Sequence, residues 1–151
     1  MKRCLLGLAL AGIGLGAQAA PAVDGAAVYA THCAACHQPD GAGALGLAPP
    51  LQGTLGQRLK VEAGRKYLTG VVTSGLAGKI ESKGVSYNGI MPNWQQLSDA
   101  ELAAVLNHVL TTFNRAELPA GYSPIAEQEL AEQRSGKPAG KQLRAWRAES
   151  D

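Results

Sequence analysis

The chain has 151 residues and a mass of 15.6 kDa, which suffices for one compact domain and excludes a large multidomain enzyme. Hydrophobic residues make up 46% and charged residues 17% of the chain, so we expect a folded protein rather than a disordered one. The formal charge of +2 comes without a block of lysines or arginines and without a nucleic-acid-binding motif, so we expect no nucleic-acid partner.

Residues 1–19 have the features of a secretory signal peptide that is cleaved during export. Lys2 and Arg3 provide the positive start, an apolar stretch follows, and the Ala-Gln-Ala of residues 17–19 matches a cleavage site. The uncharged run Cys4–Val23 leaves a retained membrane anchor as the alternative. Four glycines make this run less apolar than a membrane span requires, so we expect no stable anchor. The sequence therefore predicts an exported protein located in the periplasm.

Two of the three cysteines remain after this cleavage, and both lie in the segment Cys-Ala-Ala-Cys-His of residues 33–37. A CxxCH segment is the attachment site of a c-type haem, in which Cys33 and Cys36 bind the two vinyl groups and His37 binds the iron. A redox disulfide would not need the histidine, and a structural zinc site would need two further ligands, where the chain has only two other histidines. We therefore expect one covalently bound haem c.

Met91 is the predicted second axial ligand of the iron. Once Met1 is removed it is the only methionine, and it stands in a Gly-Ile-Met-Pro segment that is typical of a loop. Pairing of histidine with methionine is found in electron-carrying haem proteins. A haem enzyme or gas sensor would instead need an open or displaceable position on the iron, and this alternative depends on Met91 not being bound.

A helix pattern surrounds the haem motif. Gly25, Tyr29 and Cys33 repeat the small, aromatic and cysteine spacing of the first helix of the class I c-type cytochromes, and Asp24 is placed to cap that helix. Residues 22–114 thus resemble a bacterial, monohaem member of this family. The resemblance implies an all-α fold of three to four helices wrapped around one haem.

The family also holds its haem histidine with a proline carbonyl. The segment Pro-Pro-Leu-Gln-Gly of residues 49–53 resembles the loop that carries this proline, and Pro49 is the matching residue. The resemblance implies that Pro49 accepts a hydrogen bond from His37 and fixes the orientation of its ring. A plain loop stiffened by two prolines is the alternative.

The last helix of the domain is expected after Ser98. Ser98 and Glu101 have the spacing of a capping box, and apolar residues follow at helical spacing up to Leu110. The resemblance implies that this helix crosses the first one. His108 would then lie on or beside the packing face, where a structural role is favoured over a ligand role.

Between the proline loop and Met91, residues 65–72 predict a short helix and residues 79–88 a small β-hairpin. This region resembles bacterial members of the family that serve dehydrogenases and terminal oxidases. Tyr87 and Trp94 are predicted to contact the cofactor. They would either donate hydrogen bonds to the haem propionates or cover the edge of the ring, and the sequence leaves both roles open.

Residues 115–151 lie outside the resemblance, and we expect a C-terminal extension that is partly helical or loose. Its acidic and basic side chains balance and its apolar residues are sparse. Ser123 as cap and Pro124 as first residue predict a helix start, and Gly136 its end. The basic stretch Lys137–Arg147 is expected to face solvent, with a docking element for a partner as the alternative.

These features predict an electron-transfer protein rather than an enzyme. Its partners would be redox proteins, with a dehydrogenase or quinol-oxidising complex on one side and a terminal oxidase or reductase on the other. A peroxidase-like haem enzyme or gas sensor is one alternative, and a fixed cytochrome subunit of a larger dehydrogenase or oxidase is another. We expect a monomer or a subunit of such a complex.

Overall fold

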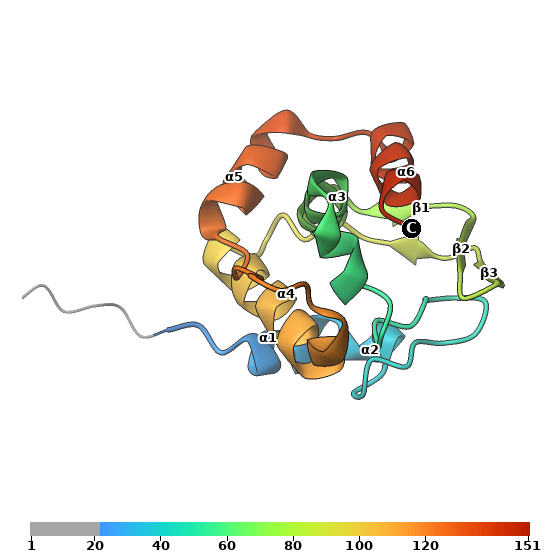
Figure 1. The fold of residues 1–151 in the computed structure, drawn as a ribbon, viewed down its shortest axis with the longest axis horizontal. Helices are drawn as coiled ribbons and strands as arrows, with labels where there is room; N and C mark the ends of the chain where they lie inside the picture. The colour runs from blue at the N-terminus through green and yellow to red at the C-terminus, as the bar shows by residue number, and fades with distance from the viewer. Residues whose placement is uncertain (1–21) are drawn as a thin grey trace, which may run out of the picture.

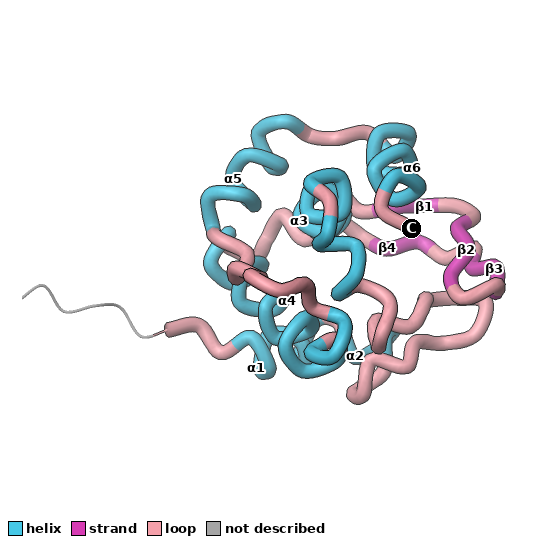
Figure 2. The backbone as a smooth tube through the Cα atoms, viewed as in Figure 1, coloured by secondary structure: helices cyan, strands magenta, loops and turns pink. Residues whose placement is uncertain are grey.

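The computed structural model describes residues 22–151, and the expected signal segment, residues 1–19, lies outside the described residues. Helices predominate in this part of the chain, as expected for an all-α fold (Figures 1 and 2). The elements are α1 (Gly25–His32), α2 (Ala34–His37), η1 (Gly56–Lys60), α3 (Glu62–Ser74), β1 (Leu76–Ala77), β2 (Ile80–Ser82), β3 (Val85–Tyr87), β4 (Ile90–Met91), α4 (Asp99–Phe113), η2 (Arg115–Glu117), α5 (Glu127–Gly136) and α6 (Gly140–Glu149). Among the described helices, none has the length and apolar character needed to cross a membrane.

Helix α1 crosses α4 at a glycine, as the sequence predicts. The carboxylate of Asp24 caps α1 by accepting a first-turn N–H at 2.9 Å. A Cβ atom on Gly25 would lie 2.2 Å from the carbonyl oxygen of Ala104, so only glycine allows this approach. The rings of Tyr29 and His108 lie 5.6 Å apart across the same contact. The expected packing position of His108 is thereby confirmed.

Replacing Gly25 by alanine is expected to destabilise the protein. The added Cβ would overlap backbone, which cannot move without separating α1 from α4, and overpacking of this kind costs about 1–3 kcal/mol or more. The free energy of unfolding measured in denaturant gives the effect. Gly136→Ala is the control, because nothing lies within 4 Å of its added Cβ. An equal effect of the two substitutions would contradict the close crossing.

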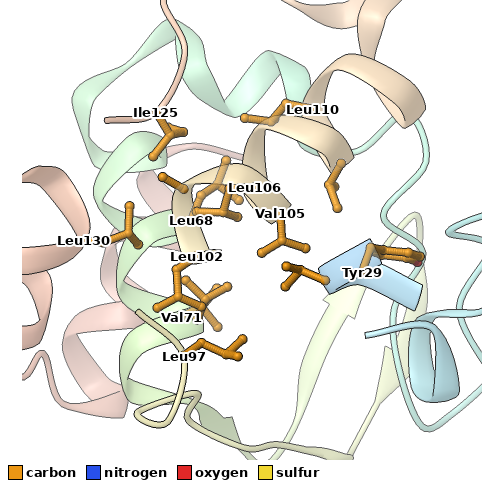
Figure 3. Close-up of a cluster of buried hydrophobic side chains, with 14 of the residues drawn as sticks. Tyr29, Leu68, Val71, Leu97, Leu102, Val105, Leu106, Leu110, Ile125 and Leu130 are labelled. Atoms are coloured by element: carbon orange, nitrogen blue, oxygen red, sulfur yellow. The ribbon is translucent and has the colours of Figure 1, made fainter. Parts of the chain in front are cut away.

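The core lies between α3, α4 and the C-terminal helices. Ser98 accepts a hydrogen bond from the N–H of Glu101 and Glu101 accepts one from the N–H of Ser98, so the predicted capping box begins α4. The buried apolar side of α4 faces α3, α1 and residues of the tail. Figure 3 shows this cluster, in which the labelled residues are Tyr29, Leu68, Val71, Leu97, Leu102, Val105, Leu106, Leu110, Ile125 and Leu130.

Two short β ladders follow α3. Strands β2 and β3 form the predicted hairpin, whose turn residues Lys83 and Gly84 have φ of 49° and 74°. Strand β4 pairs with β1, and Met91 lies opposite Leu76 in this ladder. Met91 therefore lies in a two-residue strand, where the sequence predicts a loop. The ladder holds its backbone to the end of α3 and so limits the positions that its side chain can take.

The tail differs most from expectation, because α5 and α6 pack on α3 and complete the core (Figure 1). Leu130 and Leu143 have no exposed surface and Ile125 is 3% exposed. Few apolar residues are present in the tail, yet these three are buried. Helices α5 and α6 agree with the partly helical extension that was expected, whereas a loose extension outside the core is not what the structure shows for residues 115–151.

The start of α5 also differs from its prediction. The helix begins at Glu127, since the carboxylate of Glu129 accepts the N–H of Ala126 at 2.8 Å, and not at the predicted Ser123-Pro124. The carbonyls of those two residues accept hydrogen bonds from Arg65 at 2.9 and 2.7 Å, which holds them outside the helix. The predicted end of α5 at Gly136 is confirmed.

Candidate haem site

A largely apolar cavity of about 440 Å³ opens between α2, the loop after it, α3 and the β ladders. A volume of this order matches the pockets that hold cofactors and other small ligands. Cys33, Cys36, His37 and Met91 all line it. The fold thus brings four predicted site residues, from positions far apart in the chain, to one cavity.

His37 is prepared to act as a metal ligand through its Nε2 atom. It ends α2, is 9% exposed, and its Nδ1 atom lies 3.0 Å from the carbonyl oxygen of Pro49. A carbonyl only accepts, so Nδ1 carries the hydrogen and Nε2 keeps its lone pair. Burial lowers the pKa of His37, although the hydrogen bond to Pro49 acts in the opposite direction, so the ring is neutral at pH 7. The predicted contact between His37 and Pro49 is present.

Cys33 and Cys36 are held on one turn of backbone. The N–H groups of Cys36 and His37 both donate to the carbonyl of Cys33, at 3.2 and 2.9 Å, which places the two thiols and the imidazole beside the same cavity. Burial raises the pKa of the Cys33 thiol to about 11, while Cys36 is exposed. Both thiols are free in the described residues. The pair is thus available for bonds to a group in the cavity.

Tyr87 and Trp94 also line the cavity. Tyr87 is 6% exposed, and the Trp94 ring lies 5.4 Å from that of His32 in an edge-on arrangement. Neither side chain donates a hydrogen bond to another residue in the described part of the chain. Both are therefore free to cover or to bond a group inside the cavity, and the two predicted roles remain open.

Sequence reasoning missed two arginines in the wall of the cavity. Arg58 of η1 is 5% exposed and Arg147 of α6 is 8% exposed, and both line the cavity with Tyr67 of α3. Arg147 belongs to the basic stretch that was expected to face solvent. No local motif marks either residue, because their burial depends on how α6 docks on α3.

A comparison with protein-family models decides the identity of the chain. The model described as Cytochrome c matches residues 22–113. The chain belongs to the cytochrome c family. It is similar to two proteins named cytochrome c-552 from Thermus thermophilus. With the first it shares 43% identity over 147 residues, which cover 97% of this chain and 96% of that protein. With the second it shares 44% identity over 124 residues, which cover 82% of this chain and 94% of that protein.

Membership of the family means that this cytochrome c carries a covalently attached haem c and transfers electrons. The residues of the cavity fit that group. Its walls are mostly apolar, its two thiols have the CxxCH spacing, and His37 presents an available Nε2. The buried Nε atom of Arg58 has no hydrogen-bond partner in the described residues, which is consistent with a missing polar partner inside the cavity. When bound, the haem supplies one-electron chemistry, and the protein holds and orients it.

Proposed function

We propose that this cytochrome c exchanges single electrons with redox proteins in the periplasm, through one haem held by Cys33 and Cys36 with His37 and Met91 as axial ligands. The contact between His37 and Pro49 is the observation that carries the proposal. This contact holds the hydrogen on Nδ1, so Nε2 keeps a lone pair with which it can bind iron. His37 and Met91 line the same cavity.

Two protein ligands suit electron transfer better than catalysis on a substrate. His37 and Met91 would occupy both axial positions, so oxygen, peroxide or substrate would have to displace one of them. Methionine sulfur favours ferrous iron and raises the reduction potential. The apolar wall of the cavity acts in the same direction, because the oxidised state carries the additional positive charge. A peroxidase-like enzyme or gas sensor is therefore the less favoured function.

The rim of the cavity offers a small apolar surface to partners. Leu47 and Ile90 both line the cavity, yet they are 55% and 77% exposed, and nearby Leu45 is 85% exposed. Small interfaces suit electron carriers, which must release each partner after transfer. This surface favours brief contact with redox proteins, such as a dehydrogenase and a terminal oxidase. A fixed subunit of a larger complex is the less favoured state. Size-exclusion chromatography of the native protein separates these two states.

Met91→Ala tests the axial ligand. We expect the reduction potential to fall by about 0.1–0.3 V, because axial ligands tune haem potentials over about 0.8 V. We also expect the reduced iron of this variant to bind carbon monoxide, whereas the unmodified protein should not bind it. Potentiometry and absorption spectra measure both effects.

Ile90→Ala is the matched control, since it shortens the neighbouring residue of β4 and leaves the sulfur in place. We expect its potential and carbon monoxide binding to match those of the unmodified protein. An unchanged spectrum and potential in Met91→Ala would show that another residue, or none, occupies the position.

A further inference from the structure

A buried amide at the end of α4 binds the loop that carries the proline segment. Asn114 is the C-cap of α4, lies one residue beyond the family match, and has no exposed surface. Burial of a polar side chain is costly unless its hydrogen-bonding groups find partners. The partners of this amide come from a segment about 60 positions earlier in the chain. Asn114 therefore does more than end a helix.

The oxygen of this amide caps the start of η1. Oδ1 of Asn114 accepts the N–H groups of Thr54, Leu55 and Gly56, at 3.0, 2.9 and 3.3 Å. The first N–H groups of a helix have no partner within it, and η1 has no side-chain cap from its own N-terminal residue. The distant amide takes the place of that local cap, so the start of η1 is fixed to the end of α4.

The nitrogen of the same amide fixes the loop two residues from Pro49. Nδ2 donates to the carbonyl of Leu51 at 2.8 Å and to that of Val109, in its own helix, at 3.1 Å. Pro50 stands between Pro49 and Leu51, and its ring fixes its own φ. The hydroxyl of Thr54 donates to the Pro50 carbonyl at 3.0 Å. Little conformational freedom therefore separates the amide from the carbonyl of Pro49.

The carbonyl of Pro49 is the acceptor that orients His37, at 3.0 Å from its Nδ1 atom. We propose that Asn114 is a positioning residue of the haem site, which holds the proline loop so that Pro49 keeps this hydrogen bond in both oxidation states of the iron. Asn114 does not itself line the cavity, so it acts through the loop. The inference rests on the proposed function, since it needs His37 as an iron ligand.

The hydrogen bond connects the amide to the reduction potential. A carbonyl that accepts the Nδ1–H makes the imidazole a stronger electron donor through Nε2. A stronger donor stabilises ferric iron, which carries the additional positive charge, and so lowers the potential. A loop that moves away from His37 should therefore raise the potential, an effect that loss of stability alone would not produce.

Asn114→Ala in the haem-loaded protein tests the proposal, because it removes both ends of the amide. We expect the reduction potential, measured by potentiometry, to rise. We also expect the Nδ1–H of His37 to exchange with deuterated solvent about tenfold faster, since one hydrogen bond contributes about this factor. Proton nuclear magnetic resonance of the reduced protein, in which low-spin iron is diamagnetic, measures this exchange.

Asn107→Ala is the matched control, because Asn107 holds the start of the tail as Asn114 holds the proline loop. Its Oδ1 accepts the N–H of Ile125 at 2.7 Å and the hydroxyl of Tyr122 at 2.9 Å, and its Nδ2 donates to the carbonyl of Ile125 at 2.9 Å. We expect this variant to lose stability but to keep the potential and the exchange rate of the unmodified protein. Equal changes of both quantities in the two variants would show that Asn114 has a structural role only.

Thr54→Val carries the test if Asn114→Ala does not fold. It removes the hydroxyl that binds within the proline loop and leaves Asn114 in place. Thr54 lines the cavity, so its own polarity also affects the potential, and the exchange of the His37 Nδ1–H is the deciding measurement. This exchange should be faster than in Thr111→Val, the matched control, whose lost hydroxyl bond lies within α4.

The outcomes separate this inference from the proposed function. Unchanged exchange in the Asn114 and Thr54 variants, with normal haem absorption, would overturn the inference alone. In the unmodified reduced protein, the ring protons of an iron-bound His37 should be displaced strongly by the haem ring current. Ring protons of His37 without this displacement would instead overturn the proposed function.

Discussion

Replacing Cys33 and Cys36 together by serine is expected to abolish covalent attachment of the haem. Only these two thiols line the cavity in the described residues, and serine oxygen cannot form the thioether bonds that hold the ring. His37 and Met91 would still be able to coordinate iron, so any haem that binds should leave when the chain unfolds. The protein is denatured and extracted with organic solvent, and the haem absorption of the protein fraction is then measured. This absorption should fall to background.

The single variants serve as internal controls for this result. Cys33→Ser and Cys36→Ser each keep one thiol, so each should retain haem through denaturation, with an absorption maximum shifted by the vinyl group that remains. Haem that stays with the denatured double variant would contradict attachment at this motif. Loss of haem in only one of the single variants would show that one thioether carries most of the attachment.

Truncating the buried leucines of the tail, Leu130→Ala with Leu143→Ala, is expected to produce the largest loss of stability. Each side chain is fully buried against α3, and such a truncation costs about 2–5 kcal/mol. A domain of this size has about 5–15 kcal/mol of total stability, so the double variant should lose much of it. Denaturant unfolding, followed by helical circular dichroism, measures the loss. Haem absorption followed in the same titration should change at the same denaturant concentration, because α6 also forms part of the cavity.

The control for the tail is Gln142→Ala, an exposed neighbour of Leu143 on the same helix. We expect its free energy of unfolding to change by less than about 0.5 kcal/mol, as is usual for surface positions. A double leucine variant as stable as this control would contradict a tail that belongs to the core. It would restore the expectation of an independent extension.

The attachment of a haem c could be predicted from the sequence because a short motif defines it. Cys33, Cys36 and His37 lie within five residues, and the proline loop lies near enough in the chain for spacing to identify Pro49. The capping residues of α1 and α4 and the glycine at their crossing were predictable for the same reason, since each acts over one turn or one known contact.

The tail and the arginines could not be predicted in this way. Leu130 and Leu143 are isolated among polar residues, so no apolar period marked α5 and α6 as part of the core. The hydrogen bond from Arg58 to the carbonyl of Arg147 joins residues 89 positions apart, and it exists only because α6 docks on α3. A run of basic residues is usually solvated, and it is tertiary packing that makes Arg147 an exception. Met91 lies in a strand because β4 pairs with β1, and the whole β2–β3 hairpin separates these two strands in the sequence.

The absorption spectrum of the oxidised, unmodified protein tests the central claim most directly, namely that both axial positions of the haem are filled by His37 and Met91. We predict a weak far-red band from sulfur bound to ferric iron, and no rapid spectral change when cyanide is added. A spectrum without this band, together with ready cyanide binding and turnover of hydrogen peroxide, would contradict the account and indicate a haem enzyme instead.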